Sequence, residues 1–226
     1  MNRIEVAKVL DYAVLKPTNT YRDIEEACKQ VLENHIGTLC VLPPFVKKSA
    51  ELLKGGKSKV CAVIAFPFGA SLTEVKIREA ELAVSHGAEE VDFVINIPLF
   101  KSGAYEAVER DVEEVTEAAK RAGEARGVNV VVKVIIETGY LTPEEIVSAS
   151  KLVEEAGADF VKTCTGFGPR GATLEDVRLI TSTVKKAKVK AAGGISSYSR
   201  AIEFLRAGAS RIGTSHALQI LSEAPT

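Results

Sequence analysis

The sequence is poor in the residues that usually hold metal ions or form disulfide bonds. Its 226 residues include no tryptophan, one methionine, three histidines and four cysteines. The cysteines are Cys28, Cys40, Cys61 and Cys164. None belongs to a C-x-x-C pair, so we expect free thiols rather than disulfides or a zinc site. The histidines are widely spread, and His35 and His86 fall near helix ends, where their charge would suit the helix dipole.

An excess of charge of either sign is also absent. There are 29 Lys and Arg against 30 Asp and Glu, for a formal net charge of −1. This balance offers no basic field for nucleic acid or an anionic membrane. The longest apolar runs, such as residues 130–136, are too short to span a bilayer. The first residues, MNRIEVAKVLDY, lack a signal-peptide core. We therefore expect a cytoplasmic protein without a nucleic-acid or membrane partner.

No Pro-, Ser- or Gly-rich linker divides the chain, which predicts one domain over residues 1–226. Short β-rich runs alternate with amphipathic ones such as 21–35, 72–86 and 103–125. The predicted strands are 10–15, 38–42, 59–65, 90–96, 130–137, 159–163, 188–192 and 211–213. Three segments, HGAEEVDFV, AGADFVKT and AGASRIGT, repeat one pattern, in which a glycine ends a helix and a strand follows.

Eight strands in this length give about 28 residues per strand-and-helix unit, which suits an α/β fold of the (β/α)8 TIM-barrel type. A short extra helix is expected before the first strand. The alternative is a doubly wound open sheet, which usually has fewer strands and a glycine-rich turn after the first one. The first predicted strand is followed by LKPTNT, without glycine. The pattern therefore favours the barrel.

Charged residues interrupt strands that should be apolar. Parallel strands are covered on both faces and normally read as continuous apolar runs. Lys133, Lys162 and Lys190 instead lie inside three consecutive predicted strands, and Asp92 and Asp11 lie inside two others. Side chains alternate along a strand, so neighbours such as Val132 and Val134 can face the helices while Lys133 faces inward. The lysines and at least one aspartate are thus predicted to converge inside the barrel.

Two interpretations fit this convergence. The lysines could form buried ion pairs or extend to the rim, although buried ion pairs seldom add net stability. Alternatively, one is a nucleophile. An amine attacks a carbonyl only when unprotonated, and a free lysine, with a pKa of about 10.4, is ready in roughly one molecule in 10³ at pH 7. Burial and a neighbouring ammonium both lower a lysine's pKa, and an adjacent carboxylate can move protons during Schiff-base chemistry.

Glycine-rich segments follow the last three predicted strands. They are Thr163-Cys164-Thr165-Gly166-Phe167-Gly168 at strand six, Ala191-Ala192-Gly193-Gly194-Ile195-Ser196-Ser197 at strand seven and Gly213-Thr214-Ser215 at strand eight. Backbone N–H groups and short hydroxyls at helix starts bind oxyanions, and barrel phosphate sites commonly lie after strands seven and eight. We therefore predict a phosphate site at this end.

These residues together resemble deoxyribose-phosphate aldolase. The similarity runs from LDYAVLKP to RIGTSHALQI, and its most specific segments are EVDFVINI, VKVIIETG, DFVKTCTGFGPRGAT and KAAGGIS. The resemblance implies a (β/α)8 barrel that reversibly cleaves 2-deoxy-D-ribose 5-phosphate into glyceraldehyde 3-phosphate and acetaldehyde. It implies no metal or organic cofactor, small phosphosugar and aldehyde substrates, and a homodimer or homotetramer.

The resemblance also implies roles for individual residues. Lys162 matches the Schiff-base lysine, Lys190 the second lysine that favours its neutral form, and Asp92 the aspartate of the proton relay. Other matched active-site positions are Lys133, Asp11 and Cys40. Thr165 matches a substrate-contacting threonine. The matched phosphate rim consists of Gly166, Gly193, Gly194, Gly213 and Ser215, with Ser196 beside it.

The sequence departs from the family at four places. Ser196 stands where some members carry arginine, and Phe167 where some carry lysine, which removes cationic contacts to phosphate. His216 replaces a small residue, and the sequence ends at SEAPT without the terminal tyrosine that some members use to move protons. Phosphate affinity and the proton carrier are thus the least determined features.

Two other classes of function remain open at this point. One is a different phosphate-binding barrel enzyme, an isomerase or a metal-dependent aldolase. The metal-dependent version requires His or carboxylate ligands clustered at strand ends, which the three scattered histidines do not supply. The other is an inactive barrel retained as a binding module, for which the interior lysines would have no use.

Overall fold

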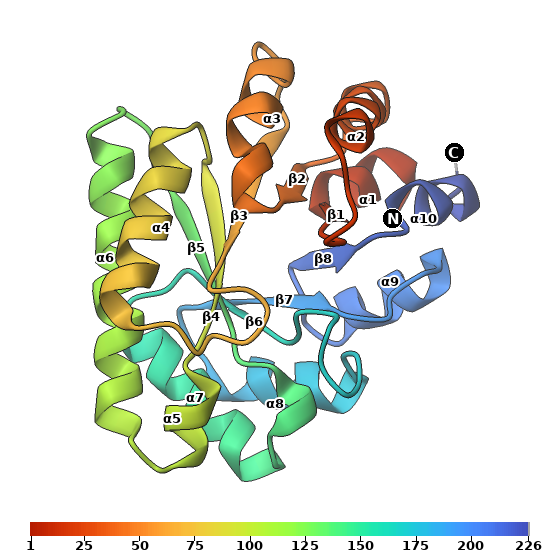
Figure 1. The fold of residues 1–226 in the computed structure, drawn as a ribbon. Coiled ribbons are helices and arrows are strands. Elements are labelled where there is room, and N and C mark those ends of the chain that lie inside the picture. The colour runs from red at the N-terminus through yellow and green to blue at the C-terminus, as the bar shows by residue number, and fades with distance from the viewer. Residues whose placement is uncertain (226) are drawn as a thin grey trace.

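The computed structural model describes residues 1–225 and contains a closed barrel of eight parallel strands, each paired with the next (Figure 1). The strands are β1 (Leu10–Val14), β2 (Thr38–Val41), β3 (Lys59–Ile64), β4 (Glu90–Val94), β5 (Val131–Ile135), β6 (Phe160–Lys162), β7 (Lys188–Ala192) and β8 (Arg211–Thr214). All eight predicted strands are present, with ends displaced by at most two residues. The (β/α)8 prediction is confirmed and the open sheet is wrong, because β8 pairs with β1.

Helices surround the barrel on the outside (Figure 1). They are α1 (Arg3–Val9), α2 (Tyr21–Glu33), α3 (Val46–Leu52), α4 (Thr73–Ser85), α5 (Ile97–Lys101), α6 (Tyr105–Glu124), α7 (Pro143–Glu155), α8 (Leu174–Thr183), α9 (Tyr198–Arg206) and α10 (Ala217–Glu223), with short 3-10 helices η1 (Pro43–Phe45) and η2 (Thr138–Tyr140). The expected extra helix is α1, which Asn2 and Glu5 start with a capping box. The short segments α5, η1 and η2 were not predicted.

The two ends of the chain meet where the barrel closes. Helices α1 and α10 are in contact, and the N and C labels lie near each other in Figure 1. The Arg3 backbone N–H donates to the Pro225 carbonyl at 2.9 Å, and the Tyr198 hydroxyl donates to the Met1 carbonyl at 2.7 Å. Thr226, the last residue of SEAPT, lies outside the described residues.

The strands divide the buried side chains into two layers. Val91, Phe93, Val132 and Val134 face outward into the main apolar core between strands and helices. Fully burying such a side chain contributes roughly 1.5–3 kcal/mol, so this layer provides most of the apolar stabilisation. The alternate positions face inward, where a small apolar cluster of Leu15, Cys40, Cys61 and Val63 lies. This alternation brings the strand lysines into the barrel, as their sequence positions predicted.

The repeated helix–glycine–strand pattern is also confirmed. Gly87, Gly157 and Gly208 follow α4, α7 and α9 and have φ of 120°, 79° and 113°, a left-handed region that glycine adopts without a Cβ clash. His86 is the C-cap residue of α4. His35 lies two residues past the end of α2, with φ 53°.

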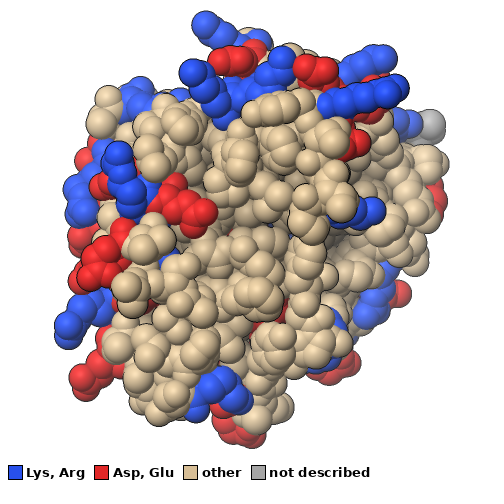
Figure 2. All heavy atoms as spheres, viewed as in Figure 1, with Lys and Arg blue, Asp and Glu red and all other residues tan. Residues whose placement is uncertain are grey.

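The outer surface carries charges of both signs. Figure 2 shows Lys and Arg mixed with Asp and Glu around the edge of one face, with mostly uncharged residues over its middle. None of the helices within residues 1–225 combines the length and apolar character needed to span a bilayer. All four cysteines are buried free thiols, as predicted.

Candidate active site

A pocket of about 700 Å³ opens at the carboxyl ends of the strands. Lys162, at the end of β6, lies in its lining with a side chain only 4% exposed. Of the predicted site residues, eleven line this pocket: Asp11, Cys40, Lys162, Thr165, Gly166, Lys190, Gly193, Gly194, Ser196, Gly213 and Ser215. Asp92 and Lys133 lie below it, fully buried. The structure therefore brings the complete predicted set together.

Asp92 of β4 is the centre of the buried polar cluster. Its Oδ2 atom accepts hydrogen bonds from Lys162 Nζ at 2.7 Å and Lys190 Nζ at 2.6 Å. Its Oδ1 atom accepts from Lys133 Nζ at 2.9 Å and from the Cys61 thiol at 3.1 Å. One carboxylate therefore bridges three amines from β5, β6 and β7.

A second carboxylate, Asp11 of β1, continues the cluster across the closing strands. It accepts from Lys190 Nζ and, at 2.8 Å, from Arg211 Nε of β8. Glu90, at the start of β4, forms ion pairs with Lys133 Nζ at 2.6 Å and with the Arg211 guanidinium at 3.3 Å. These contacts extend the ion pairs from the pocket floor to the opposite end of the barrel.

The cluster contains one more cation than it has carboxylates. Its cations are Lys133, Lys162, Lys190 and Arg211, and its carboxylates are Asp11, Glu90 and Asp92. Charged groups away from water are stable only when paired, so the surplus cation is costly. Lys162 has one carboxylate neighbour, which it shares with two other lysines.

The pKa values of the neighbours show which groups stay charged. Burial opposes the charge on Lys190, but Asp11 and Asp92 outweigh it and raise the pKa of Lys190 above its usual value. The pKa of Lys133 is raised in the same way. Burial would raise the pKa of Asp92, but the three lysines outweigh it and hold that pKa well below its usual value. Lys190 and Lys133 therefore remain ammonium groups, contrary to the simple expectation that burial lowers a lysine's pKa.

The rim of the pocket has the glycine-rich geometry that the sequence predicted. Gly193 and Gly194 follow β7 with φ of 99° and 75°, which an L side chain rarely adopts. Gly213 has an additional use, because a Cβ there would lie 2.9 Å from Ala192 Cβ and 3.1 Å from Lys190 Cε. The absence of a side chain at Gly213 thus makes room for Lys190.

Several pocket residues were not singled out from the sequence, among them Lys16 and Asn19 from the loop after β1. Phe167 and His216, two of the departures from the family, also line the pocket. The Phe167 ring packs edge-on against Phe66, with centroids 5.4 Å apart, and forms an apolar edge. The pocket therefore has a basic group, Lys16, although the sequence departures at Ser196 and Phe167 removed two others.

The sequence analysis gave no role to three further charged residues. Glu90 and Arg211 are the first residues of β4 and β8, and their side chains join the cluster inside the barrel. Strand parity was the available signal, since Glu90 has the parity of Asp92 and Arg211 that of Gly213. Glu137, buried just after β5, was part of a quoted segment but received no role.

One group of side chains has atoms close enough to ligate a metal ion. The thiols of Cys40 and Cys61 and a carboxylate oxygen of Asp92 lie within 4.8 Å of one another. Asp92 already accepts from three amines, and a divalent cation would add charge where cations are in excess. The residues present therefore do not suit a metal ion.

This chain is similar in sequence to aldolases. A family profile described as "DeoC/LacD family aldolase" matches residues 4–222. The chain is 52% identical over 218 residues to a deoxyribose-phosphate aldolase of Carboxydothermus hydrogenoformans, covering 96% of this chain and 94% of the relative. It is 48% identical to a deoxyribose-phosphate aldolase of Thermococcus kodakarensis, covering 100% and 99%.

Solved structures agree with the sequence relatives. The aldolase QR15 superimposes with a TM-score of 0.90 at 45% identity, covering 96% of this chain and 95% of that one. A tetrameric deoxyribose phosphate aldolase from Aeropyrum pernix gives a TM-score of 0.89 at 32% identity, covering 97% and 91%. With this fold, this pocket and these relatives, the chain belongs to the DeoC/LacD family of aldolases.

Proposed function

We propose that this aldolase cleaves 2-deoxy-D-ribose 5-phosphate reversibly into glyceraldehyde 3-phosphate and acetaldehyde through a Schiff base on Lys162. The observation that carries the proposal is the pocket floor, where the Lys162 amine contacts one shared carboxylate and the cluster holds a surplus cation. Relatives that are 52% and 48% identical to this chain are named deoxyribose-phosphate aldolases, which supports 2-deoxy-D-ribose 5-phosphate as the substrate.

The reaction would begin with neutral Lys162 attacking the aldehyde carbon of the open-chain sugar. The resulting carbinolamine loses water to form an iminium. The bond between C2 and C3 then breaks as the C3 hydroxyl gives up its proton, releasing glyceraldehyde 3-phosphate. The electron pair of that bond becomes the enamine on Lys162. Protonation of the enamine carbon and hydrolysis of the new iminium free acetaldehyde and the amine.

Asp92 and Lys190 are the proposed proton carriers for these steps. Asp92 hydrogen-bonds to both Lys162 and Lys190, so a water in the pocket could exchange protons with this group. Lys190 lines the pocket, whereas Lys133 lies below it. We therefore assign the pocket end of the relay to Lys190, and to Lys133, Asp11 and Cys40 the role of holding Asp92 and Lys190 in place.

The phosphate is proposed to lie at the rim formed by Gly166, Gly193, Gly194, Ser196, Gly213 and Ser215, with Lys16 as its basic partner. Backbone N–H groups and hydroxyls there would accommodate the phosphate oxygens. Gly213 takes part through its backbone and through the space that it leaves for Lys190.

The decisive experiment traps the Schiff base. The protein is incubated with acetaldehyde, reduced with borohydride and digested, and the modified lysine is mapped by mass spectrometry. We expect a reduced adduct on Lys162. Lys188, an exposed lysine at the opposite end of β7, provides the control, because its alanine variant should still be labelled at Lys162. Absence of an adduct, or an adduct on a surface lysine with Lys162 unmodified, would overturn the mechanism.

We further propose a single-domain, cytoplasmic enzyme that forms a homodimer or homotetramer and uses no cofactor, nucleic acid or membrane. The tetrameric relative from Aeropyrum pernix supports the oligomer, as do the exposed apolar side chains Phe68, Leu72 and Val75 around the start of α4. Light scattering on the purified protein tests the assembly; a monomer at micromolar concentration would contradict it.

A further inference from the structure

Glu137 is a buried carboxylate with no part in the mechanism above. It is the second residue after the end of β5 and is 1% exposed. Its backbone has φ 53° and ψ 68°, a left-handed conformation that is uncommon for a residue with a side chain. The side chain does not line the pocket. A strained, buried carboxylate next to an active site indicates a specific task.

The partner of Glu137 is Thr165, three residues beyond Lys162. The Glu137 Oε2 atom accepts from the Thr165 backbone N–H at 3.0 Å and also from the Thr165 hydroxyl. Because the backbone N–H can only donate, Oε2 acts as an acceptor. The single hydroxyl proton of Thr165 is therefore directed toward Glu137.

The remaining hydrogen-bonding capacity of Thr165 is defined by these contacts. A hydroxyl has one proton and two lone pairs. The Phe167 backbone N–H donates to Thr165 Oγ1 at 3.0 Å and occupies one lone pair. One lone pair remains, and Thr165 lines the same pocket as Lys162. In this arrangement Thr165 can accept a hydrogen bond from a ligand but cannot donate one.

The surroundings hold the Glu137 carboxylate in this position. Its second oxygen, Oε1, is buried and has no hydrogen-bond partner within residues 1–225. It lies against Gly168, where an added Cβ would approach Oε1 to 2.7 Å. The glycine thus makes room for the carboxylate under the loop of residues 165–168, and that arrangement leaves one polar oxygen unsatisfied.

We infer that Glu137 is a positioning residue that makes Thr165 a pure acceptor, so that the pocket selects a substrate carrying a hydroxyl group close to the Schiff-base carbon. This inference rests on the proposed function. It adds to that function that Thr165 recognises the hydroxyl-bearing chain and that Glu137 orients the Thr165 hydroxyl. An aldehyde without a hydroxyl, such as acetaldehyde, makes no use of this contact.

Two reactions of the same protein separate recognition from chemistry. Cleavage of 2-deoxyribose 5-phosphate requires the hydroxyl-bearing chain. Exchange of the acetaldehyde methyl protons for deuterium in D2O, followed by NMR, requires only Lys162 and the proton relay. If wild-type protein shows no exchange, the proposed function fails, whatever the role of Glu137.

Glu137→Leu and Thr165→Val are expected to lower kcat/KM for cleavage about tenfold more than they lower the exchange rate. Thr165→Val removes the acceptor of the substrate hydroxyl, and Glu137→Leu removes the group that orients this acceptor. The double variant should lose no more than either single variant, because the two residues act in series. Glu137→Gln, whose side-chain oxygen can still take both Thr165 donors, should largely restore the ratio.

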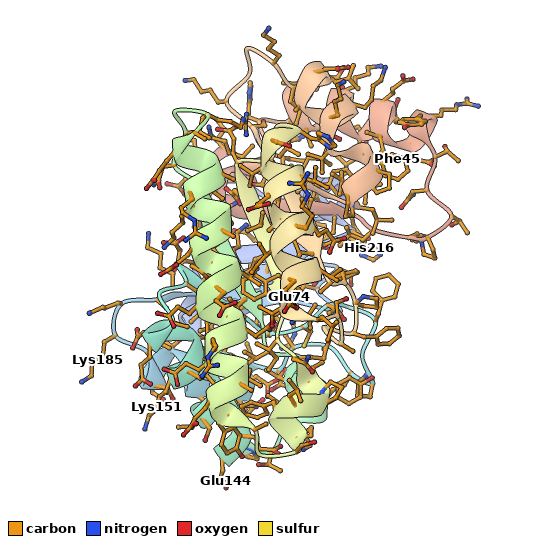
Figure 3. All side chains as sticks on the ribbon, turned by 60° about the vertical axis from the view of Figure 1, so that its left-hand side comes forward. Phe45, Glu74, Glu144, Lys151, Lys185 and His216 are labelled. Atoms are coloured by element: carbon orange, nitrogen blue, oxygen red, sulfur yellow. The ribbon has the colours of Figure 1, made fainter. Side chains whose placement is uncertain are left out.

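The control is Glu154→Leu. Glu154 also accepts backbone N–H groups, those of Lys185, Lys186 and Ala187. In Figure 3 Lys185 lies on the opposite side of the molecule from His216, which lines the pocket. The Glu154→Leu variant should leave the ratio of the cleavage rate to the exchange rate unchanged. Losses that multiply in the Glu137→Leu/Thr165→Val double variant would overturn the inference. If Glu137→Leu does not fold, a wild-type ratio in Thr165→Val would overturn it alone.

Discussion

At the scale of single residues, Lys162 differs from its neighbours in how few carboxylates it contacts. Lys133 lies within ion-pair distance of three carboxylates and Lys190 of two, whereas Lys162 contacts Asp92 alone. Three lysines of similar sequence context therefore have different electrostatic tasks. Two are held as ammonium groups by their partners, and the third has the fewest carboxylate contacts.

Replacing Lys162 should separate activity from stability. We expect Lys162→Ala to abolish cleavage while the unfolding free energy changes by less than about 2 kcal/mol, because the remaining three cations match three carboxylates. Urea denaturation followed by circular dichroism, together with an assay of glyceraldehyde 3-phosphate release, checks both halves. The comparison is Asp92→Asn, which leaves four cations with two carboxylates and should cost about 3–5 kcal/mol. Normal turnover in Lys162→Ala would refute the assignment.

Lys16 offers a test of phosphate recognition at the rim. It is exposed and lines the pocket. Its positive charge could replace the cationic contacts that Ser196 and Phe167 do not provide. We expect Lys16→Met to raise KM for 2-deoxyribose 5-phosphate about tenfold, because a charge-assisted hydrogen bond is lost. KM for unphosphorylated 2-deoxyribose should stay the same. Equal increases for both sugars would show that Lys16 does not recognise the phosphate.

At the scale of secondary structure, α4 and α6 are joined by a second buried ion pair. Lys76 of α4 donates to Asp111 of α6 at 2.6 Å and to the Val94 carbonyl at the end of β4 at 3.1 Å. The side chains are 0% and 2% exposed. Figure 3 shows these two helices side by side on the outside of the barrel. The pair thus ties two helices to the strand that carries Asp92.

Replacing one residue of this ion pair should destabilise the protein more than replacing both. We expect Lys76→Met to lower the unfolding free energy by about 3–5 kcal/mol, because Asp111 stays buried without its cationic partner and keeps only the hydrogen bond from the Thr73 hydroxyl. The double variant Lys76→Met/Asp111→Leu should recover most of that loss. Urea denaturation of the three proteins measures the difference, and a double variant as unstable as Lys76→Met would contradict this account.

At the scale of the whole molecule, the buried cluster should determine how stability depends on pH. Asp11 and Asp92 have pKa values below the usual 3.8, so their stabilisation is present above about pH 4 and is lost as the pH falls further. Lys133 and Lys190 have pKa values above the usual 10.5, so their stabilisation is present below about pH 10.5 and is lost as the pH rises beyond it.

The melting temperature should therefore form a plateau with a fall at each end. Calorimetry between pH 2 and about 12 measures it. Because Asp92→Asn removes one of the depressed carboxylates, that variant should show a shallower fall on the acid side. A melting temperature that is constant between pH 4 and 2 would show that the cluster carboxylates do not link protonation to folding.

The sequence alone determined the barrel and the inward lysines, because both depend on local periodicity. Side chains of a strand alternate with a period of two, so apolar neighbours such as Val132 and Val134 decide where Lys133 points. The eight strands could be located for the same reason, to within two residues. The resemblance then connected these positions to Schiff-base chemistry and to the phosphate rim.

Only the tertiary structure decided which charges balance and which hydroxyl points where. Lys190 and Asp11 are 179 residues apart in sequence, and they meet because β8 closes onto β1. Arg211 of β8 meets Asp11 of β1 through the same closure, and it also forms an ion pair with Glu90 of β4. Glu137 reaches Thr165 only because β5 and β6 are neighbours. Contacts of this kind depend on strand neighbours and loop geometry, which local periodicity does not encode.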